Sequence, residues 1–395
     1  MPSCLICTPI TIIGAGPAGI SAAATAAAAG CRVILVDASQ RLGGSVTAAL
    51  HRSLCGLYSA APSSPLDTLN DGMQRNLVAR MLSKAPTLVL PRQLGPAWVL
   101  EFPTSAWESS LADICSDTRI DLRLGTRVLQ VRRDAHRVHS IQIAGRDSEW
   151  IEVRALIDCT GGGQLLQLIG EDVMQPIDDS PMLGGYAVRW ANLPGDVEML
   201  RLQTPYVLAQ AVAAGLLPPA ARFTVFHPGP GDGEGVCKLA INPNEFSPEQ
   251  VEPFVTATLE HLRRELPAFA SAKIVERSPR ALRRDGRRLL GKATVTESDV
   301  LTARRHGPDA VHAWWPIERW DALTGPTYAY PPPGQHYDIS PDALQSDKLE
   351  NLFAAGASLS ATAPAAASLR ASGICLATGQ AAGKLVATMA LPGMG

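Results

Sequence analysis

The sequence predicts an α/β fold in which the two ends of the chain form one domain and the middle forms a smaller second one. Two observations carry this prediction. The first 37 residues contain a strand, a glycine-rich turn, an alanine-rich helix and a second strand. The strand-then-glycine order returns at 351–356, before a helical segment at 373–390. A chain of 395 residues is also long enough for about two domains.

The N-terminal segment has the pattern of a βαβ unit. Ile10–Ile13 is a short apolar run, as expected of a buried strand. Gly14-Ala-Gly-Pro-Ala-Gly19 follows directly, and residues 20–29 are almost all alanine, the strongest helix former. Arg32–Val36 is a second apolar run, with Asp37 at its carboxyl end. A parallel, Rossmann-like sheet begins with such a unit.

The spacing of the glycines in this unit predicts a dinucleotide site. Gly14 permits a tight turn, Gly16 lets the backbone approach a pyrophosphate, and Gly19 lets the helix pack on the strand. The helix amino terminus, with its free N–H groups, faces phosphates in such sites. Asp37 comes 18 residues after Gly19, where a carboxylate accepts hydrogen bonds from a ribose.

Shorter elements follow. Residues 38–103 are rich in Gly, Ser and Pro, and the capping-box spacing of Ser105 and Glu108 predicts a helix to about residue 116. Apolar runs separated by turn residues then predict strands at 120–124, 127–131, 138–143 and 151–157. The last of these leads into Asp158-Cys-Thr-Gly-Gly-Gly163.

The middle of the chain predicts an inserted α+β substrate or cap domain. It contains helical segments near 204–215 and 248–265 and a glycine-rich hairpin turn at 228–235. The basic run Arg277–Arg288 is interpreted as an exposed face between domains. Aromatic residues gather near its end, which favours a site wall for an apolar or aromatic substrate: Trp314, Trp315, Trp320, Tyr328 and Tyr330.

These patterns predict a discontinuous first domain of residues 1–175 and 336–395 and a cap of residues 176–335. Residues 45–100 are a further candidate part of the cap. The substrate site is expected where the two domains meet.

Composition and charge exclude several classes of function. Lys and Arg total 35 against 37 Asp and Glu, so the chain lacks the positive charge expected for nucleic-acid or anionic-membrane binding. The apolar N-terminal stretch is interrupted by glycines and has no basic segment before it, which argues against a signal peptide or a membrane span. Most of the eight cysteines lie in apolar runs, as expected of free thiols in a reducing compartment. We therefore expect a cytoplasmic protein.

Several motifs together resemble one family. The chain is similar to FAD-dependent oxidoreductases of the glutathione-reductase-type two-dinucleotide-fold superfamily, which are related to the fumarate reductase and succinate dehydrogenase flavoproteins. The motifs cover both ends of the chain and the late middle. They are Arg41-Leu-Gly-Gly-Ser45, Leu156-Ile-Asp-Cys-Thr-Gly161, Arg287-Arg-Leu-Leu-Gly291, Tyr337-Asp-Ile339 and the tail from Asn351 to Gly383.

The resemblance implies FAD as cofactor and assigns residues to it. The glycine turn implies contacts to the pyrophosphate, and Asp37 implies a contact to the adenosine ribose. The start of the last helix implies N–H groups aimed at the flavin pyrimidine edge, where reduced flavin carries negative charge. The implied cofactor residues are Gly14, Gly16, Pro17, Ala18, Gly19, Asp37, Arg41, Gly43, Gly44, Ser45, Val128, Thr160, Gly161, Gly356, Arg370, Gly373 and Ile374.

Three residues are candidates for catalysis, because they belong to segments that reach the flavin ring in this family. His51 and His336 have side chains that titrate near neutral pH and serve as general bases. His51 is also a candidate point of covalent flavin attachment. Arg370 is suited to hold a substrate carboxylate or to support reduced flavin. No metal site is expected.

The predicted function is therefore two-electron oxidation or reduction of a small molecule, by hydride transfer through the flavin. The motifs leave the substrate and the electron donor or acceptor open. One alternative is a flavin-dependent monooxygenase. Another is a maturation factor that modifies a residue of a partner protein.

Overall fold

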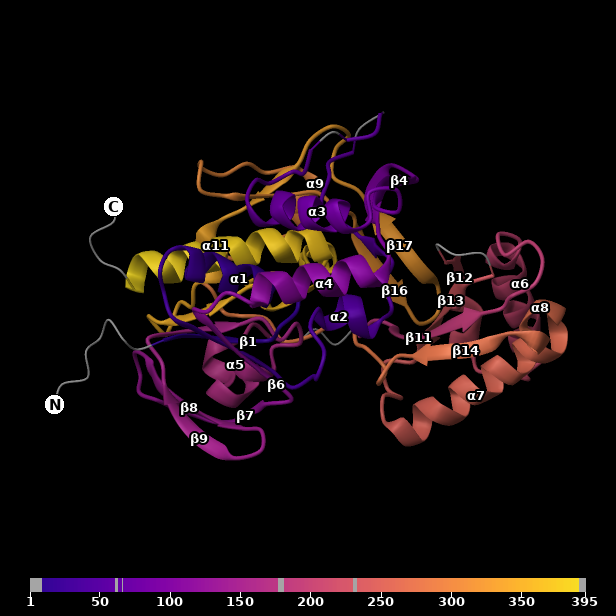
Figure 1. Ribbon diagram of the computed structural model, residues 1–395, viewed down its shortest axis with the longest axis horizontal. Helices are drawn as coiled ribbons and strands as arrows, with labels where there is room; N and C mark the ends of the chain where they lie inside the picture. The colour runs from indigo at the N-terminus through magenta and orange to yellow at the C-terminus, as the bar shows by residue number, and fades with distance from the viewer. Residues whose placement is uncertain (1–8, 61–62, 66, 177–180, 230–232, 391–395) are drawn as a thin grey trace.

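The computed structural model describes residues 9–60, 63–65, 67–176, 181–229 and 233–390. Its centre is a parallel sheet of five strands in the order β19-β10-β1-β2-β6, shown in Figure 1. The predicted βαβ unit is confirmed, with α1 running from Pro17 to Ala28 between β1 and β2. The strands are β1 (Ile10–Ile13), β2 (Val33–Asp37), β6 (Ile120–Leu124), β10 (Ala155–Asp158) and β19 (Leu352–Ala354).

Helices cover one face of this sheet. The last helix, α11 (Ser372–Ala390), lies beside α1, and α4 (Thr104–Cys115) also packs on α1 (Figure 1). Alternate strand residues such as Ile12 and Leu35 are buried in the core on this side. The two ends of the chain thus share one hydrophobic core.

An antiparallel meander covers the other face. It consists of β7 (Arg127–Arg133), β8 (Val138–Ala144) and β9 (Ser148–Glu152), packed with the short helix α5 (Gln164–Ile169). The prediction of one strand at 151–157 is wrong in this respect. Residues up to Glu152 pair antiparallel with β8, whereas β10 pairs parallel with β1, so the chain changes sheet at Val153–Arg154.

A second unit has its own core and lies at the right of Figure 1. Its antiparallel sheet has the order β12-β13-β11-β14, and the large buried side chains are Trp190, Phe226 and Phe269. The domain boundaries at 175 and 336 stay predictions. The elements of this unit are β11 (Gly184–Ala191), α6 (Leu200–Ala213), β12 (Val225–Pro228), β13 (Gly235–Ile241), α7 (Pro248–Glu265), α8 (Pro267–Ser271) and β14 (Lys273–Arg277).

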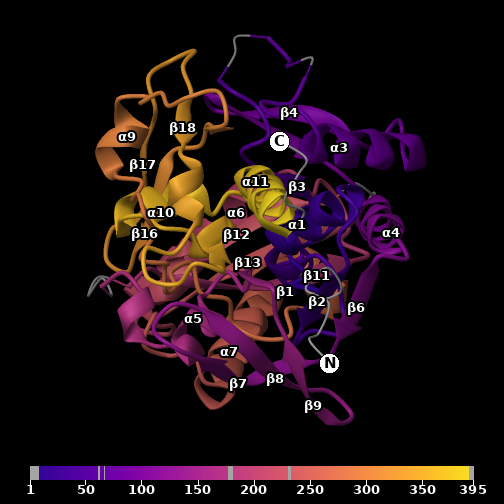
Figure 2. The same cartoon turned by 90° about the vertical axis from the view of Figure 1, so that its left-hand side faces the viewer.

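Two further parts of the chain pack on the unit that contains the parallel sheet. One comes from residues 44–101 and the other from residues 297–339 and 363–369, and parts of both lie at the upper side of Figure 2. Apolar side chains from both, including Leu77, Trp98 and Ile317, belong to the same core as β1. Their elements are α2 (Gly44–Ala48), β3 (Ser53–Leu54), α3 (Met73–Lys84), β4 (Leu90–Leu94), β5 (Ala97–Glu101), α9 (Glu297–Leu301), β15 (Val311–Ala313), β16 (Ile317–Asp321), β17 (Gly325–Ala329), β18 (Tyr337–Ile339) and α10 (Ala363–Leu369).

The sequence predicts that the basic run Arg277–Arg288 is an exposed face, but several of its side chains are buried or half-buried. Arg288 is 7% exposed, and its Nε donates to the Ala361 carbonyl at 2.8 Å. The Arg284 Nη1 donates to the carbonyls of Leu183 and Gly184 at 2.6 and 2.7 Å. The run therefore holds neighbouring segments together. Within the described ranges, no helix is long and apolar enough to cross a membrane.

Candidate functional site

The glycine turn between β1 and α1 has the geometry that its sequence predicts. Gly14 has a φ of +107°, which favours glycine, and a Cβ there would lie 2.3 Å from the Cys159 carbonyl oxygen. A Cβ at Gly19 would lie 1.7 Å from the Gly14 oxygen. Gly16 precedes the first turn of α1 and has space around it, with Gly44 Cα 3.7 Å from the position of a Cβ. This turn leaves the amino terminus of α1 open for a phosphate.

A second glycine pair lies against the first. Gly43 and Gly44 have φ angles of +99° and +54°, and the Gly43 N–H donates to the Ala15 carbonyl at 2.9 Å. A Cβ on Gly44 would lie 2.8 Å from Gly16 Cα. Backbone therefore meets backbone here, as a cradle for a pyrophosphate requires.

Asp37 lies at the same edge of the sheet. Its Oδ2 accepts from the Ala15 N–H at 2.5 Å and its Oδ1 from the Ser39 N–H at 2.7 Å. The Thr126 N–H donates to the Asp37 carbonyl at 2.9 Å, which brings the start of β7, and with it Val128, near this edge. A hollow of about 550 Å³ opens beside this contact. It is lined by Gln40, Leu122, Arg123, Leu124, Gly125, Thr126, Gly145 and Arg146.

The carboxyl ends of β10 and β19 complete the edge. The Thr160 N–H and hydroxyl donate to Asp158 Oδ1 at 2.8 and 2.7 Å, and burial raises the pKa of the Asp158 carboxyl. Gly161 faces open space, with a φ of +73°. Gly356, with a φ of +69°, lies close to Ala18, since its Cβ would be 3.0 Å from the alanine Cβ. The implied cofactor segments thus converge on one edge, and their individual contacts to FAD stay predictions.

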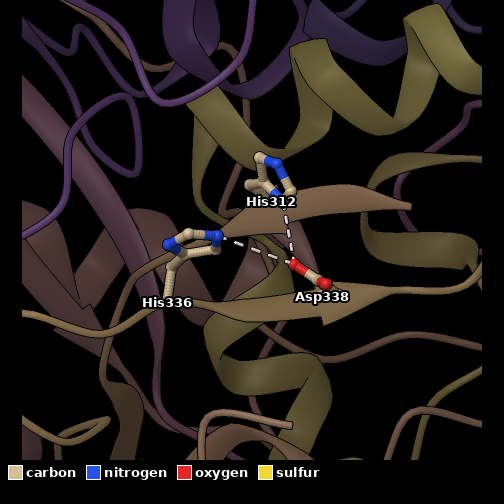
Figure 3. Close-up of side chains that lie close together, drawn as sticks. All are labelled: His312, His336 and Asp338. Atoms are coloured by element: carbon tan, nitrogen blue, oxygen red, sulfur yellow. Dashed lines mark hydrogen bonds and ion pairs between the residues drawn. The ribbon is translucent and has the colours of Figure 1, made fainter. Parts of the chain in front are cut away.

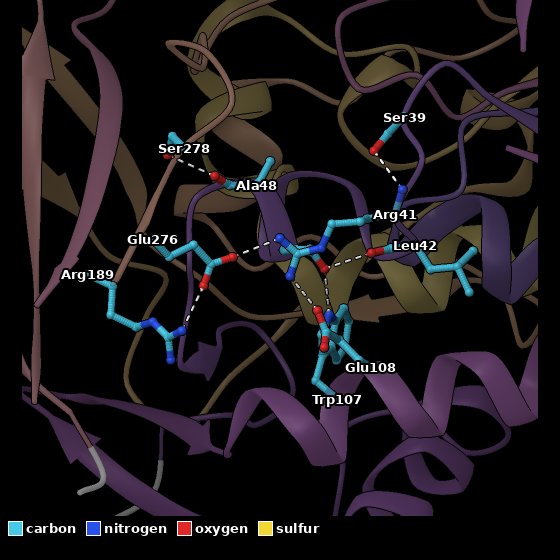
Figure 4. A network of polar contacts seen from close by, with 10 residues as sticks. Ser39, Arg41, Leu42, Ala48, Trp107, Glu108, Arg189, Glu276 and Ser278 are labelled. Atoms are coloured by element: carbon cyan, nitrogen blue, oxygen red, sulfur yellow. Dashed lines mark hydrogen bonds and ion pairs between the residues drawn. The ribbon is translucent and has the colours of Figure 1, made fainter. Parts of the chain in front are cut away.

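Arg41 forms two ion pairs with acidic side chains on other elements. Its guanidinium contacts Glu108 on α4 at 2.5 Å and Glu276 on β14 at 2.8 Å, as Figure 4 shows. Glu276 also contacts Arg189 at 3.2 Å. Arg41 therefore links the first unit to the second, and its predicted place along the pyrophosphate stays a prediction. Ser45 on α2 is exposed.

The start of α11 is covered by the loop after β3. The Gly373 N–H donates to the Cys55 carbonyl at 2.7 Å, and the Cys55 N–H donates to Ser372 Oγ at 3.2 Å. A Cβ on Gly373 would lie 2.5 Å from the Gly56 carbonyl carbon. Ile374 is buried against Gly56. One N–H that was expected to face the flavin is therefore used by this loop.

Near this loop lies a group of nitrogen-bearing side chains that we call the basic cluster: His51, His227, Lys238, Arg284 and Arg370. Lys238 on β13 reaches across from the second unit, and its Nζ lies 2.9 Å from His51 Nδ1. Burial lowers the pKa of Lys238 to about 8. The pKa of His227 is lowered too, by desolvation and by the charge of Lys238, although its side chain is exposed. Burial and the nearby Lys238 hold the pKa of His51 well below its usual value. His51 is thus neutral, and it accepts from the lysine.

One carboxylate, Glu318 on β16, lies beside the basic cluster. It accepts from the Trp320 Nε1 at 2.6 Å and from the Trp315 Nε1 at 3.2 Å. Arg370 donates from Nη2 to the Glu318 backbone carbonyl at 3.0 Å, and the same nitrogen lies 3.8 Å from the carboxylate. Burial alone would raise the pKa of Glu318, but Arg370 and the two indoles lower it. Glu318 is therefore ionised and flanked by aromatic side chains.

The structure brings two of the three catalytic candidates together and sets the third apart. The charge of Arg370 acts on His51, so both belong to the basic cluster. His336, directly before β18, instead lies close to His312 on β15 and Asp338 on β18, as Figure 3 shows. His312 Nδ1 is 2.8 Å from Asp338 Oδ1 and His336 Nε2 is 3.8 Å from it. A catalytic role for His336 stays a prediction.

Within the described residues, these three are the one His, Cys, Asp and Glu group with ligand atoms close enough for a metal ion. Asp338 already has donors on both oxygens. Its Oδ2 accepts from Arg305 Nε and from the His306 N–H, each at 2.9 Å, and its Oδ1 faces His312. The carboxylate is therefore satisfied by protein groups, and it ties three segments of the chain together.

We expect Asp338→Asn to lower the free energy of unfolding by about 1.5–3 kcal/mol, because it weakens hydrogen bonds to a buried charge. Asp338 is 1% exposed. Burial opposes its ionisation, but hydrogen bonds from His306, Arg305 and His312 outweigh burial and lower its pKa below the ordinary value. A lowered pKa stabilises the fold above about pH 4 and loses this effect as pH falls further.

Urea unfolding at pH 7 and pH 3.5 checks this expectation. The gap between wild type and Asp338→Asn should be wide at pH 7 and narrower at pH 3.5. Asp309→Asn is the matched control, because Asp309 is an exposed carboxylate nearby. Equal midpoints for Asp338→Asn and Asp309→Asn at pH 7 would contradict the expectation.

Sequence reasoning did not select Lys238, His227, Arg284 or Glu318. One signal was present: Lys238 is a lone charge in the apolar strand Gly235–Ile241. A charge in such a strand is costly unless it has a partner or a function. His227 and Glu318 carry no comparable signal, because only the packing of the two units brings them near His51.

Comparison with known proteins agrees with this fold and cradle. The family model described as FAD dependent oxidoreductase matches residues 9–180 and 233–393. No curated protein matches the chain. The solved structures it resembles include BexE, studied for oxidation during BE-7585A biosynthesis, with 16% identity and a TM-score of 0.51. They also include AlpK, with 12% identity and a TM-score of 0.50.

The aligned region covers nearly all of this chain but a smaller share of each solved structure. It covers 97% of this chain and 62% of BexE, and 98% of this chain and 63% of AlpK. This chain therefore spans less than two thirds of the length of either protein. Identities this low show a shared fold and nothing finer. The family model matches most of the chain, and its residues include the glycine turn, Asp37 and the last helix. The chain belongs to the family of FAD-dependent oxidoreductases.

Proposed function

We propose that this protein carries out a two-electron oxidation or reduction of a small molecule, at the boundary between its two units. The observation that carries the proposal is the basic cluster. His51 and Arg370 come from the segments that flank the implied flavin site, while Lys238 comes from the inserted sheet. Titratable groups brought together from two units, with shifted pKa values, are typical of an active site.

The described residues fit FAD as the cofactor. Side chains have no place at Gly14 and Gly44, because a Cβ at either would lie 2.8 Å or less from backbone atoms, and this leaves an all-backbone cradle beside Gly16. Gly14, Gly16 and Gly19 would hold the pyrophosphate, and Asp37 the ribose. When bound, FAD supplies the two-electron redox chemistry. The narrower likeness to glutathione-reductase-type and fumarate reductase flavoproteins rests on the sequence motifs.

His51 and Lys238 would handle a proton in the reaction. Lys238 donates to His51 Nδ1, which leaves His51 Nε2 as the nitrogen that bears the hydrogen. Because the pKa of Lys238 is lowered to about 8, this amine gains and loses a proton near neutral pH. Arg370 would favour negative charge at the flavin or on the substrate.

The test is reduction of the FAD-loaded protein without oxygen. Rapid bleaching of the flavin absorption by NADH or NADPH, followed by fast reoxidation in air, would support the monooxygenase alternative. No bleaching by nicotinamide nucleotides, together with bleaching by a small-molecule metabolite fraction, is the result expected for a dehydrogenase or oxidase. Bleaching only by a protein fraction would favour the maturation factor. A protein that takes up no FAD contradicts all three.

Arg370→Met should lower the midpoint potential of the bound flavin, because a nearby cation favours the reduced, more negative state. The interaction of a charge at a few ångströms in partly buried surroundings is about 1–3 kcal/mol. For a two-electron couple this corresponds to about 20–60 mV. Lys384→Met removes an exposed charge from the same end of the chain and serves as control. Equal potentials for the two variants would contradict this role of Arg370.

A further inference from the structure

The basic cluster has more positive than negative charge. Its positive charges are those of Lys238, Arg284 and Arg370. They interact electrostatically with one another or with the same neighbours, and Glu318 is the carboxylate that interacts with Lys238 and Arg284. His51 and His227 face the same region, and the pKa of each is lowered. Three cations therefore share one anion, and their side chains are partly buried.

The protein partners of these cations are mostly neutral. Lys238 donates to a histidine ring and Arg284 to two backbone carbonyls. Arg370 donates to a backbone carbonyl, its side chain is 21% exposed, and its Nε is buried with no hydrogen-bond partner. Burying cations with too few counter-ions is costly, and Glu318 is the one carboxylate beside these three partly buried cations, so the arrangement favours an anion that binds between these side chains.

The wall beside the cluster is aromatic. Trp315 and Trp320 direct their indole nitrogens at Glu318, and the Arg284 guanidinium lies 4.0 Å from the centre of the Trp320 ring. Tyr328, on the strand paired with β16, also interacts electrostatically with Glu318 and Arg284. An anion bound here would have aromatic surface next to it.

We propose that the substrate of this enzyme carries a carboxylate on an apolar or aromatic body, and that Lys238 and Arg370 bind this carboxylate. The guanidinium fork of Arg370 suits the planar carboxylate, and Lys238 adds a point charge from the opposite unit. The inference rests on the proposed function, and it adds the substrate class. It also makes Lys238 the residue through which the inserted sheet recognises the substrate.

The experiment measures binding of benzoate and acetate to the FAD-loaded protein, by flavin absorbance and by calorimetry. Benzamide and acetamide are the neutral matched probes. The expected result is that benzoate binds at least about 10-fold more tightly than benzamide at pH 7. Its affinity should fall as pH rises through about 8, because Lys238 then loses its charge. Of the other groups at the site, His51, His227 and Glu318 have lowered pKa values, and burial raises the pKa of Cys55 and of Tyr328 to about 12. Burial lowers the pKa of Arg284 to about 9, so the Lys238 variant is needed to separate the charge of the lysine from that of Arg284.

Variants separate the lysine from general effects of charge. Lys238→Met should weaken benzoate binding at least about 10-fold and remove most of its change between pH 7 and pH 8. Lys273→Met removes an exposed charge from the same sheet and should bind benzoate as wild type does. If neither carboxylate binds at 100 mM, or if both variants bind alike, the inference is overturned. A protein that binds benzoate in calorimetry but takes up no FAD would instead contradict the proposed function.

Discussion

Gly16→Ala is expected to weaken FAD binding at least about 100-fold, a loss of about 2.7 kcal/mol. Gly16 stands at the start of α1, and the pyrophosphate must approach its backbone closely. A Cβ there would lie 3.7 Å from Gly44 Cα, an ordinary contact, so the protein itself has room for the methyl group. The loss would therefore come from the cofactor. Titration of apoprotein with FAD, followed by flavin fluorescence, measures it.

Two glycine variants make this result specific. Gly307→Ala should bind FAD as wild type does, because a Cβ there meets open space. Gly14→Ala should fail to fold well, because its Cβ would collide with the Cys159 carbonyl. If Gly16→Ala and Gly307→Ala bind FAD equally while both are folded, the pyrophosphate does not lie at this turn.

Gly379→Val is expected to destabilise the protein by about 3 kcal/mol or more. Gly379 on α11 faces α1, and a Cβ there would lie 2.1 Å from the Ala18 carbonyl oxygen. Gly383 repeats this contact one turn later, with its Cβ 2.6 Å from the Ala22 carbonyl oxygen. A valine therefore pushes the two helices apart, and overpacking of this kind costs about 1–3 kcal/mol or more.

The midpoint of urea unfolding measures this effect. Lys384→Val is the matched control, because it places the same β-branched residue at an exposed position of α11. Its helix-propensity cost is below about 1 kcal/mol. A Gly379→Val midpoint equal to that of Lys384→Val would show that α1 and α11 do not pack through these glycines.

The sequence predicted the elements whose signals are local. The strand–glycine–helix–strand unit at 10–37, the helix at 248–265 and the last helix are present within a few residues of the predicted bounds. In these segments, alanine content, glycine spacing and apolar periodicity all favour the same element. Family motifs in the two ends then indicated FAD without any knowledge of their packing.

Other parts of the fold depend on contacts that a sequence does not display. The helix α3 (Met73–Lys84) lies in a segment that was interpreted only as rich in turn residues. The run at 151–157 is apolar at most positions and looks like one strand. In the structure its first residues pair with β8 and its last residues pair with β1, so it belongs to two sheets. The basic run at 277–288 contains the buried Arg288, whose side chain donates a hydrogen bond to the carbonyl of Ala361, 73 residues further along the chain.

The candidate site shows the same limit. His51 and Arg370 could be selected because each follows or precedes a recognisable motif. Lys238 is separated from His51 by 187 residues, and only the packing of the inserted sheet brings their nitrogens within 2.9 Å. Arg41 was selected for the pyrophosphate, but in the structure it contacts Glu108 and Glu276.

The most direct test of the account is the flavin content of the purified protein. The visible spectrum is recorded, the protein is denatured, and the released cofactor is identified and counted per chain. We predict a two-banded yellow spectrum and one FAD released per chain. Yellow colour that stays with the denatured protein would instead support covalent attachment, with His51 as the first residue to examine. A colourless protein that takes up no FAD on reconstitution would contradict the central claim.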